Sequence, residues 1–411
     1  MITHCRVAKA LAAILVLVPV IYADDSTSPS DSAVITLSTN AIPFELEEAE
    51  IVVPALINGH KVHLLLDTGS ELVFISPKVA ALVGIHSESR AQVKGNGAEQ
   101  RSAQVARAAS LAVGSITAHE VPLGIMPFPS DFHWDGILGD SFLDHFAFHV
   151  DYDRRLVTFH LPSEKNLDGT PSTQLPFKIL STTGKQNGVA VTIEAEIDGT
   201  KANFAIDTGS GQELVLYPWF TEQHKLRDSY PNRVKVITGA GLGGLIHGEI
   251  VRLHSLKLGE LNLTNLVAEF GSEGSYAELD RSHRVAGVIG GGALLRFNYT
   301  FDFPNRQLGL EPSREFSADI PPPASVNSGM VCWPTGTQWE IVDVIPQSAA
   351  AEAGIQIGER LLRINNKPIE TYKFCAIRDV FRSKPGTIVH LTVQTNGKEP
   401  REVTLILRNL L

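Results

Sequence analysis

Cysteine is scarce in this sequence, with three residues in a chain of 411. Cys5 lies in an N-terminal segment that we expect to be removed, so Cys332 and Cys375 are the two that remain. The large central part of the chain must therefore fold without disulfides. We expect two buried thiols near the C-terminus, and a bridge between Cys332 and Cys375 stays open as the alternative.

Charge is also sparse, because charged residues make up 19% of the chain against 43% hydrophobic residues. This balance predicts folded globular domains and excludes a disordered chain. The formal net charge is −10, so the protein has no electrostatic reason to bind nucleic acid. His60 and His63 would face opposite sides of a strand, and no His-Glu-x-x-His motif occurs. We expect no metal site and no cofactor.

No apolar run reaches the ~20 residues that a helix needs to cross a bilayer. The run Ala10 to Tyr22 has 13 residues, follows Arg6 and Lys9, and ends before Ala23. This pattern is typical of a secretory signal peptide, with a retained anchor as the alternative. We therefore expect residues 1–23 to direct export to the periplasm or the medium and to leave no stable membrane span. Loss of Arg6 and Lys9 would take the net charge from −10 to −12.

An internal repeat organises the rest of the chain. The segment Leu64–Ser70 (LLLDTGS) corresponds to Phe204–Ser210 (FAIDTGS) at an offset of 140, and Gly136–Gly139 (GILG) to Gly287–Gly290 (GVIG) at an offset of 151. Landmarks that keep their order while the offset grows indicate two copies of one unit, the second enlarged by small insertions. The segments are short, rich in Val, Ile, Leu and Thr, and separated by Asn-Gly and Asp-Gly turns, which predicts mainly β lobes.

The repeat also predicts the domain organisation. Three consecutive prolines follow the second copy and favour an extended linker. Within the lobes we expect only two short helices, at Asp140–Phe146 and Gly291–Phe297. The expected segments are a signal peptide (1–23), a first lobe (40–162), a second lobe (175–312), a Pro-rich linker (313–325) and a C-terminal domain (326–411).

Asp67 and Asp207 each follow three apolar residues and precede Thr-Gly-Ser. Two carboxyl groups within hydrogen-bonding distance share one proton, because two negative charges at such a short distance repel each other and both groups cannot be ionised together. The ionised member can take a proton from water while the protonated member hydrogen-bonds a substrate carbonyl. The titrations are coupled, so the sequence does not tell which aspartate holds the proton.

The neighbours of each aspartate suit this chemistry. The threonines can hydrogen-bond across the interface between the copies, and the serines can donate to the outer carboxylate oxygens. Gly69 and Gly209 permit a tight turn and let backbone N–H groups approach the carboxylates. The supporting residues predicted in this way are Thr68, Gly69, Ser70, Thr208, Gly209 and Ser210.

Over about residues 40–312 the sequence resembles the pepsin and retropepsin superfamily, in which each half supplies Asp-Thr-Gly and, later, two hydrophobic residues and Gly. Here those are Ile137-Leu138-Gly139 and Val288-Ile289-Gly290. The resemblance implies that they pack beneath the catalytic loops, with Gly139 and Gly290 as further supporting residues. The resemblance implies two β-barrel lobes related by a pseudo-twofold axis. It also implies that Asp67 and Asp207 are the catalytic pair of an aspartic endopeptidase, with polypeptide substrates and no oligomer required for activity.

The resemblance has departures. Each lobe is nearer to retropepsin size, no lobe disulfide can form, and residues 84–113 lack the tyrosine that pepsin-like enzymes carry on the first flap. Glycines allow a flap hairpin to open, and they predict two flap tips, one at Gly95, Asn96 and Gly97 and the other at Gly239, Gly241 and Gly243. The second of these segments also fits a dinucleotide-binding glycine pattern. We do not expect it to bind nucleotide, because Gly248 would interrupt the helix that such a motif requires.

The C-terminal segment contains Ile341–Pro346, Ser348–Ile355, Gly358–Asn365 and a helix-like stretch, Thr371–Lys384. This pattern resembles a PDZ domain of the bacterial protease-associated kind, a small α+β domain. Such domains accept a peptide as an extra strand between a sheet edge and a helix, and hold its C-terminus with backbone N–H groups. A peptide or C-terminal ligand is therefore expected in a groove formed by Gly329, Met330, Val331 and Cys332.

The carboxylate loop Ser328–Val331 is a poor copy of the usual Gly-hydrophobic-Gly-hydrophobic form. Cys332 is expected on the groove strand and Cys375 on the groove helix, where a disulfide would pin the groove. The leading interpretation of the whole chain is an active endopeptidase whose PDZ domain presents substrate. The alternative is a catalytically inactive peptide-binding or PDZ scaffold protein, but both loops retain Asp, Thr, Gly and Ser, which favours the enzyme.

Overall fold

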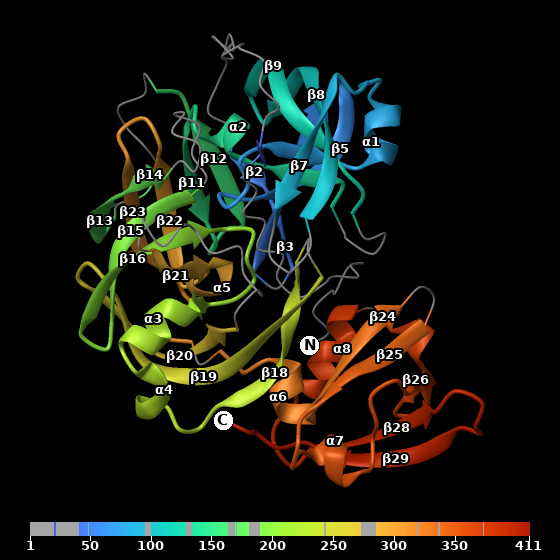
Figure 1. Cartoon of the computed structure of the whole chain (residues 1–411). Helices are drawn as coiled ribbons and strands as arrows, with labels where there is room; N and C mark the ends of the chain where they lie inside the picture. The colour runs from blue at the N-terminus through green and yellow to red at the C-terminus, as the bar shows by residue number, and fades with distance from the viewer. Residues whose placement is uncertain are drawn as a thin grey trace.

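The computed structural model shows two β lobes and a C-terminal domain (Figure 1). The predicted signal peptide lies outside the described residues except for Val20–Ile21. The described residues are 20–21, 41–47, 49–94, 100–128, 134–162, 169, 171–180, 190–241, 244–272, 285–318, 320–335, 338–372 and 374–411.

The first lobe is a nine-stranded sheet in the order β1-β7-β8-β9-β6-β10-β5-β4-β3, and a further pairing of β8 with β4 curls it towards a barrel. Strand β9 alternates buried and partly exposed positions over most of its length, whereas the central strands β6 and β10 are buried throughout. The elements of this lobe are β1 (Val20–Ile21), β3 (Glu45–Glu47), β4 (Glu50–Ile57), β5 (His60–Leu66), β6 (Val73–Ile75), α1 (Pro77–Leu82), β7 (Ser89–Lys94), β8 (Gln100–Val113), β9 (Ile116–Ile125), β10 (Gly136–Leu138) and α2 (Asp140–Leu143).

The second lobe repeats this plan with eight strands in the order β14-β15-β16-β21-β17-β20-β19-β18, and β15 pairs with β19 where β4 pairs with β8 in the first. Its elements are β14 (Lys178–Leu180), β15 (Ala190–Ile197), β16 (Thr200–Asp207), β17 (Leu214–Leu216), α3 (Pro218–Gln223), α4 (Leu226–Ser229), β18 (Val234–Gly241), β19 (Gly244–Leu258), β20 (Leu261–Gly271), β21 (Val285–Gly290) and α5 (Gly291–Leu294).

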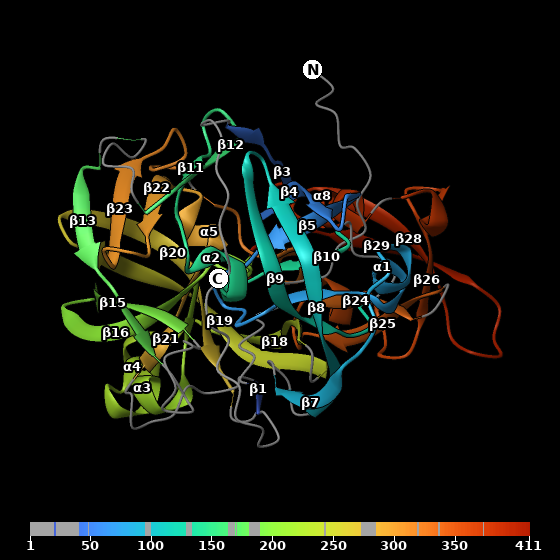
Figure 2. The same cartoon turned by 90° about the horizontal axis from the view of Figure 1, so that it is seen from above.

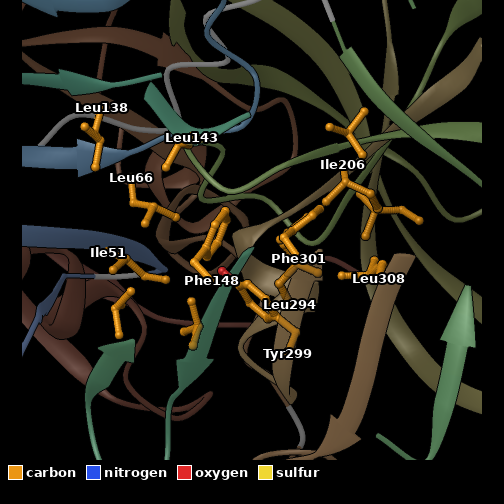
Figure 3. Close-up of a cluster of buried hydrophobic side chains, with 14 of the residues drawn as sticks. Ile51, Leu66, Leu138, Leu143, Phe148, Ile206, Leu294, Tyr299, Phe301 and Leu308 are labelled. Atoms are coloured by element: carbon orange, nitrogen blue, oxygen red, sulfur yellow. The ribbon is translucent and has the colours of Figure 1, made fainter. Parts of the chain in front are cut away.

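A six-stranded antiparallel sheet joins the lobes, because β11 of the first copy pairs with β22 of the second. Phe148 and Phe301 are partners in this register, and their ring centroids are 5.2 Å apart. They lie in one hydrophobic core that draws side chains from both lobes (Figure 3). The strands of this sheet are β2 (Ile42–Pro43), β11 (Ala147–Asp151), β12 (Leu156–His160), β13 (Thr173–Pro176), β22 (Phe297–Asp302) and β23 (Gln307–Pro312).

The C-terminal domain has its own sheet, in the order β24-β25-β26-β28-β29, and its own core. Strand β24 is at an edge of this sheet, beside α8. The elements of the C-terminal domain are α6 (Ala324–Ser328), β24 (Met330–Thr335), β25 (Gln338–Val344), α7 (Ala349–Glu352), β26 (Arg360–Ile364), β27 (Lys367–Pro368), the 3-10 turn η2 (Ile369–Thr371), α8 (Phe374–Phe381), β28 (Ile388–Gln394) and β29 (Arg401–Ile406).

The C-terminal domain packs against β18 of the second lobe, as Figures 1 and 2 show from two sides. Asp343 on β25 accepts a hydrogen bond of 2.8 Å from the backbone N–H of Ile237 on β18. Beside this bond, apolar side chains of β18–β20 meet Val326 and Ile345 of the C-terminal domain in a shared cluster. The domain is therefore docked on the hairpin that was predicted to form the second flap.

The predicted fold class is confirmed: the chain is mainly β, with two barrel-like lobes and a small α+β domain. The helix predictions were wrong in two respects. The helices at 140 and 291 end at Leu143 and Leu294, because Phe146 and Phe297 turn into the core and Phe297 starts β22. Helices α1, α3 and α4 were missed. The C-terminal stretch Thr371–Lys384 is helical only over α8, preceded by η2.

Candidate active site

Each aspartate lies at the end of a buried central strand. Strand β10 runs parallel to β5, with Leu138 opposite Leu66, and the backbone N–H of Asp67 donates to Leu138 O at 3.1 Å. In the second lobe β21 runs parallel to β16, with Gly290 opposite Asp207. Asp67 and Asp207 are 0% and 1% exposed. The predicted loops are thus held by equivalent strands in the two copies.

The two threonines link the loops across the interface. Thr68 Oγ1 donates to Ile206 O at 3.1 Å, and Thr208 Oγ1 donates to Leu66 O at 2.8 Å. Thr68 Oγ1 also accepts from the Thr208 backbone N–H at 3.2 Å, and Thr208 Oγ1 accepts from the Thr68 backbone N–H at 3.0 Å. Four buried hydrogen bonds therefore fix the separation of the two aspartate loops, and a bond of this kind contributes about 1 kcal/mol.

The glycines after the threonines make room for the opposite carboxyl group. A methyl group placed on Gly69 would lie 2.4 Å from Asp207 Oδ2, and one on Gly209 would lie 2.4 Å from Asp67 Cγ. The backbone N–H of each glycine also donates to Oδ1 of the aspartate in its own loop, at 2.8 Å in both cases. The structure therefore brings Asp67 and Asp207 together, each carboxyl lying against the loop that carries the other.

Burial raises the pKa of both carboxyl groups. For Asp67 the largest cause is loss of hydration, followed by the charge of Asp207 and a hydrogen bond between the two side chains. Burial raises the pKa of Asp207 to about 6, and hydrogen bonds from Asp67 and from the Gly209 backbone oppose this rise. Two acids in this arrangement hold one proton between them near neutral pH, and the shared proton belongs to the pair.

The serines do not have the predicted role. Ser70 Oγ donates to Leu72 O at 2.9 Å, so it stabilises its own turn instead of a carboxylate. Ser210 Oγ is buried and has no hydrogen-bond partner within the described part of the chain. Beneath the loops, a methyl group on Gly139 would lie 2.2 Å from Leu72 O, and one on Gly290 would lie 2.3 Å from Gln212 O. These two glycines therefore allow close packing under the two aspartate loops.

Further acids surround the pair, and the sequence reasoning missed them. Glu50 is buried at the start of β4, where loss of hydration raises its pKa to about 8 and the charge of Asp207 adds to the rise. Asp140, buried at the start of α2, also has a raised pKa, chiefly through burial. The sequence could have predicted that Glu50 is buried, because it directly precedes the apolar run Ile51-Val52-Val53.

A buried ion pair supports the second loop. Arg296 donates to Glu213 Oε1 at 3.0 Å from Nε and at 2.7 Å from a terminal nitrogen, while Glu213 Oε2 accepts from the Val267 backbone at 2.7 Å. Both side chains are nearly inaccessible, at 3% and 4% exposed. Glu213 lies six residues after Asp207, so the ion pair anchors the chain that leaves the Asp207 loop.

Of the predicted flap tips, the structure describes only Gly239 and Gly241. Gly95, Asn96 and Gly97, between β7 and β8, lie outside the described residues, as does Gly243. Gly239 and Gly241 lie on β18, opposite Ile246 and Gly244 of β19. The second hairpin therefore has the expected position in the chain, and its β18 strand is the one that contacts the C-terminal domain.

The carboxylate loop of the predicted peptide groove differs from the form that binds a peptide C-terminus. The backbone N–H of Gly329 donates to Ser325 O at 2.8 Å, and that of Met330 to Ser328 Oγ at 3.3 Å. These donors are used within the loop, so they are not available for a terminal carboxylate. Cys332 on β24 is a free thiol whose pKa is raised by burial. This agrees with the thiol expected at Cys332, whereas the side chain of Cys375 lies outside the described residues.

Three protein-family models match segments of this chain. Residues 53–145 match the family described as "gag-polyprotein putative aspartyl protease", residues 193–291 the family described as "Aspartyl protease", and residues 340–395 the PDZ domain family. A solved aspartic proteinase from Irpex lacteus is similar at 15% identity and a TM-score of 0.47, covering 68% of this chain and 99% of its own. No curated protein matches the chain.

The chain thus consists of two aspartic protease-like lobes and a C-terminal PDZ domain, as its resemblance predicted. Domains of both kinds bind peptides. Among the described residues no helix has the length and apolar character to cross a membrane. The same residues contain no group of three or more His, Cys, Asp or Glu side chains placed to hold a metal ion.

Proposed function

We propose that this protein is an aspartic endopeptidase that hydrolyses peptide bonds with a water activated by Asp67 and Asp207. The observation that carries this proposal is the mutual approach of the two carboxyl groups, each of which occupies the space that a side chain on the other loop's glycine would need. The raised pKa values support it, because a pair that retains one proton contains both a base and an acid.

The reaction follows from this shared proton. The ionised carboxylate removes a proton from the bound water, and the water oxygen attacks the peptide carbonyl carbon. The protonated carboxyl hydrogen-bonds the carbonyl oxygen and stabilises the charge that develops there. The proton taken from water then passes to the departing nitrogen, and the pair returns to its singly protonated state. The four threonine hydrogen bonds keep the carboxyl groups at a constant separation throughout.

The test is cleavage of an unfolded protein between pH 4 and 7. We expect turnover that a statine-type transition-state mimic inhibits, and loss of at least about 1,000-fold in Asp67→Asn and in Asp207→Asn, since the pair acts as a unit. Thermal unfolding of the variants controls for folding. Turnover that survives in either folded variant would contradict the proposal.

Export and substrate presentation belong to the same proposal. The basic and apolar pattern before Ala23 supports removal of residues 1–23 during export to the periplasm or the medium. The PDZ domain, docked on β18, supports a role in holding substrate near the cleft. N-terminal sequencing of the protein recovered from cell fractions tests the first part, and a chain that retains Met1 would contradict it.

A further inference from the structure

The second flap, the hairpin of β18 and β19, is joined to the rest of its lobe only up to one level. Strand β19 pairs with β20 from Leu258 back to Gly248, and the Ser272 N–H donates to His247 O at 3.2 Å. Beyond that bond, towards the tip, the described residues of β19 pair with β18, which is the last strand in the order of this sheet. The outer hairpin is therefore a two-stranded ribbon, and such a ribbon has little stability of its own.

A β-bulge interrupts β18 at the same level. Ile237 is opposite His247 and Gly239 is opposite Ile246, so Thr238 is one residue more than β19 can match. The Thr238 hydroxyl donates to Ile246 O at 3.4 Å, which is long for a hydrogen bond. A bulge bends its strand and disrupts the ladder locally. The hairpin can therefore bend at Thr238 more easily than at the regular pairs on either side.

The PDZ domain holds β18 on the lobe side of this bulge (Figures 1 and 2). Asp343 Oδ2 accepts the hydrogen bond of 2.8 Å from the Ile237 N–H, the last backbone group before Thr238. Val234 and Val236, further towards the base, belong to the apolar cluster that the two domains share. The base of β18 is therefore held by β19 on one side and by the PDZ domain on the other.

At the bulge itself, the flap and the PDZ domain border a cavity of about 200 Å³. Thr238 and Gly239 line it on the flap side, and Met330 and Phe381 line it on the PDZ side. Closely packed side chains resist displacement, because a shift of one creates overlaps with its neighbours. The space beside Thr238 and Gly239 lets the outer hairpin move without pushing against the PDZ domain. The same strand is thus held before the bulge and has room to move from it onwards.

We propose that the PDZ domain sets the hinge of the second flap by fixing β18 up to Ile237, so that opening of the cleft moves the hairpin only beyond this residue. The restraint does not depend on the chemistry, but its effect on cleavage rests on the proposed function. Release of the domain would move the hinge towards Val234 and let more of the hairpin leave its closed position. A smaller closed fraction weakens the apparent binding of substrate in proportion and leaves the reaction of the aspartates unchanged.

Hydrogen exchange in full-length Asp67→Asn measures the restraint without any cleavage. In this background Asp343→Ala removes the acceptor of the Ile237 bond, so the amides of residues 234–237 should exchange about tenfold faster, since a hydrogen bond to a charged group has about this effect. Asp343→Asn retains an oxygen that can accept and should show a smaller increase. The matched control is Glu402→Ala, which removes a hydrogen bond of 2.8 Å from Thr392 within the PDZ sheet and should leave this exchange unchanged.

Cleavage by the same variants, with both aspartates present, measures the consequence. Asp343→Ala should raise KM about tenfold and change kcat by less than about twofold, because it alters binding and not the chemical step. Unchanged exchange of residues 234–237 in folded Asp343→Ala would overturn the proposal whether or not the protein cleaves peptides. Faster exchange with an unchanged KM would also overturn it. Absence of cleavage by the parent chain, with the expected exchange, would instead reject the proposed function and leave the hinge standing.

Discussion

Positions 69 and 209 require glycine because the aspartate of the opposite loop leaves no room for a side chain, and not because of the backbone angles at these positions. Neither residue has a positive φ, so an alanine would be acceptable to the backbone at both. The conflict lies in the 2.4 Å between an added methyl group and the opposite carboxyl. The sequence could predict that these positions need glycine, but it could not show which atoms exclude a side chain.

We therefore predict that Gly209→Ala displaces Asp67 and lowers the cleavage rate by roughly 100-fold, because small displacements of catalytic groups have effects of this size. The control is Gly199→Ala in the turn between β15 and β16, where no atom lies within 4 Å of an added methyl group. Its positive φ costs about 1 kcal/mol of stability, and its activity should be retained. Equal activity in the two variants would contradict the steric account.

Glu50 gives a second prediction at this scale, on pH. Its pKa is raised from 4.5 to about 8 in the folded protein, so folding favours the protonated form. Its contribution is fully present below the unfolded pKa and is lost as pH rises through 8, by at most about 5 kcal/mol. The melting temperature should fall between pH 5 and 8.5, and Glu50→Gln should flatten that fall. A variant with the wild-type slope would show that Glu50 does not titrate in this range.

The strands were easier to predict than the helices. Apolar runs bounded by Asn-Gly and Asp-Gly turns predict the β hairpins, and the repeat assigns them to two equivalent lobes. Helices α1 and α3 have only six residues each, too short for a periodic pattern to show. Their signal was local: Ser76 caps α1 by accepting a hydrogen bond from Val79 N–H, and proline follows the cap position in both.

The buried pair of Arg296 and Glu213 supplies a prediction at the scale of elements, because it ties the end of α5 to the start of β17. Arg296→Gln leaves Glu213 buried without its counter-charge and should lower the free energy of unfolding by about 3–5 kcal/mol. The matched control is Lys201→Gln, which breaks an exposed pair with Glu194 and should cost less than about 0.5 kcal/mol. Denaturant titration of both variants measures the difference; similar losses would contradict the assigned role.

At the scale of the whole molecule, the internal repeat predicted that two distant motifs form one site, since two copies of a unit can pair about a common axis. The position of the PDZ domain could not be predicted in the same way. It depends on side chains such as Asp343 and Val326 that meet β18 and its neighbours only after three domains have folded. No pattern within one segment encodes such a contact. The domain boundaries stay predictions, as does the exported location.

The central claim is that Asp67 and Asp207 act as one unit with one shared proton, and a double-mutant cycle on peptide cleavage tests it most directly. Asp67→Asn, Asp207→Asn and the double variant should all fall to the same residual rate, because loss of either carboxyl removes the pair. Losses that add up in the double variant, or one single variant that keeps substantial activity, would show that the two aspartates work separately and would contradict this account.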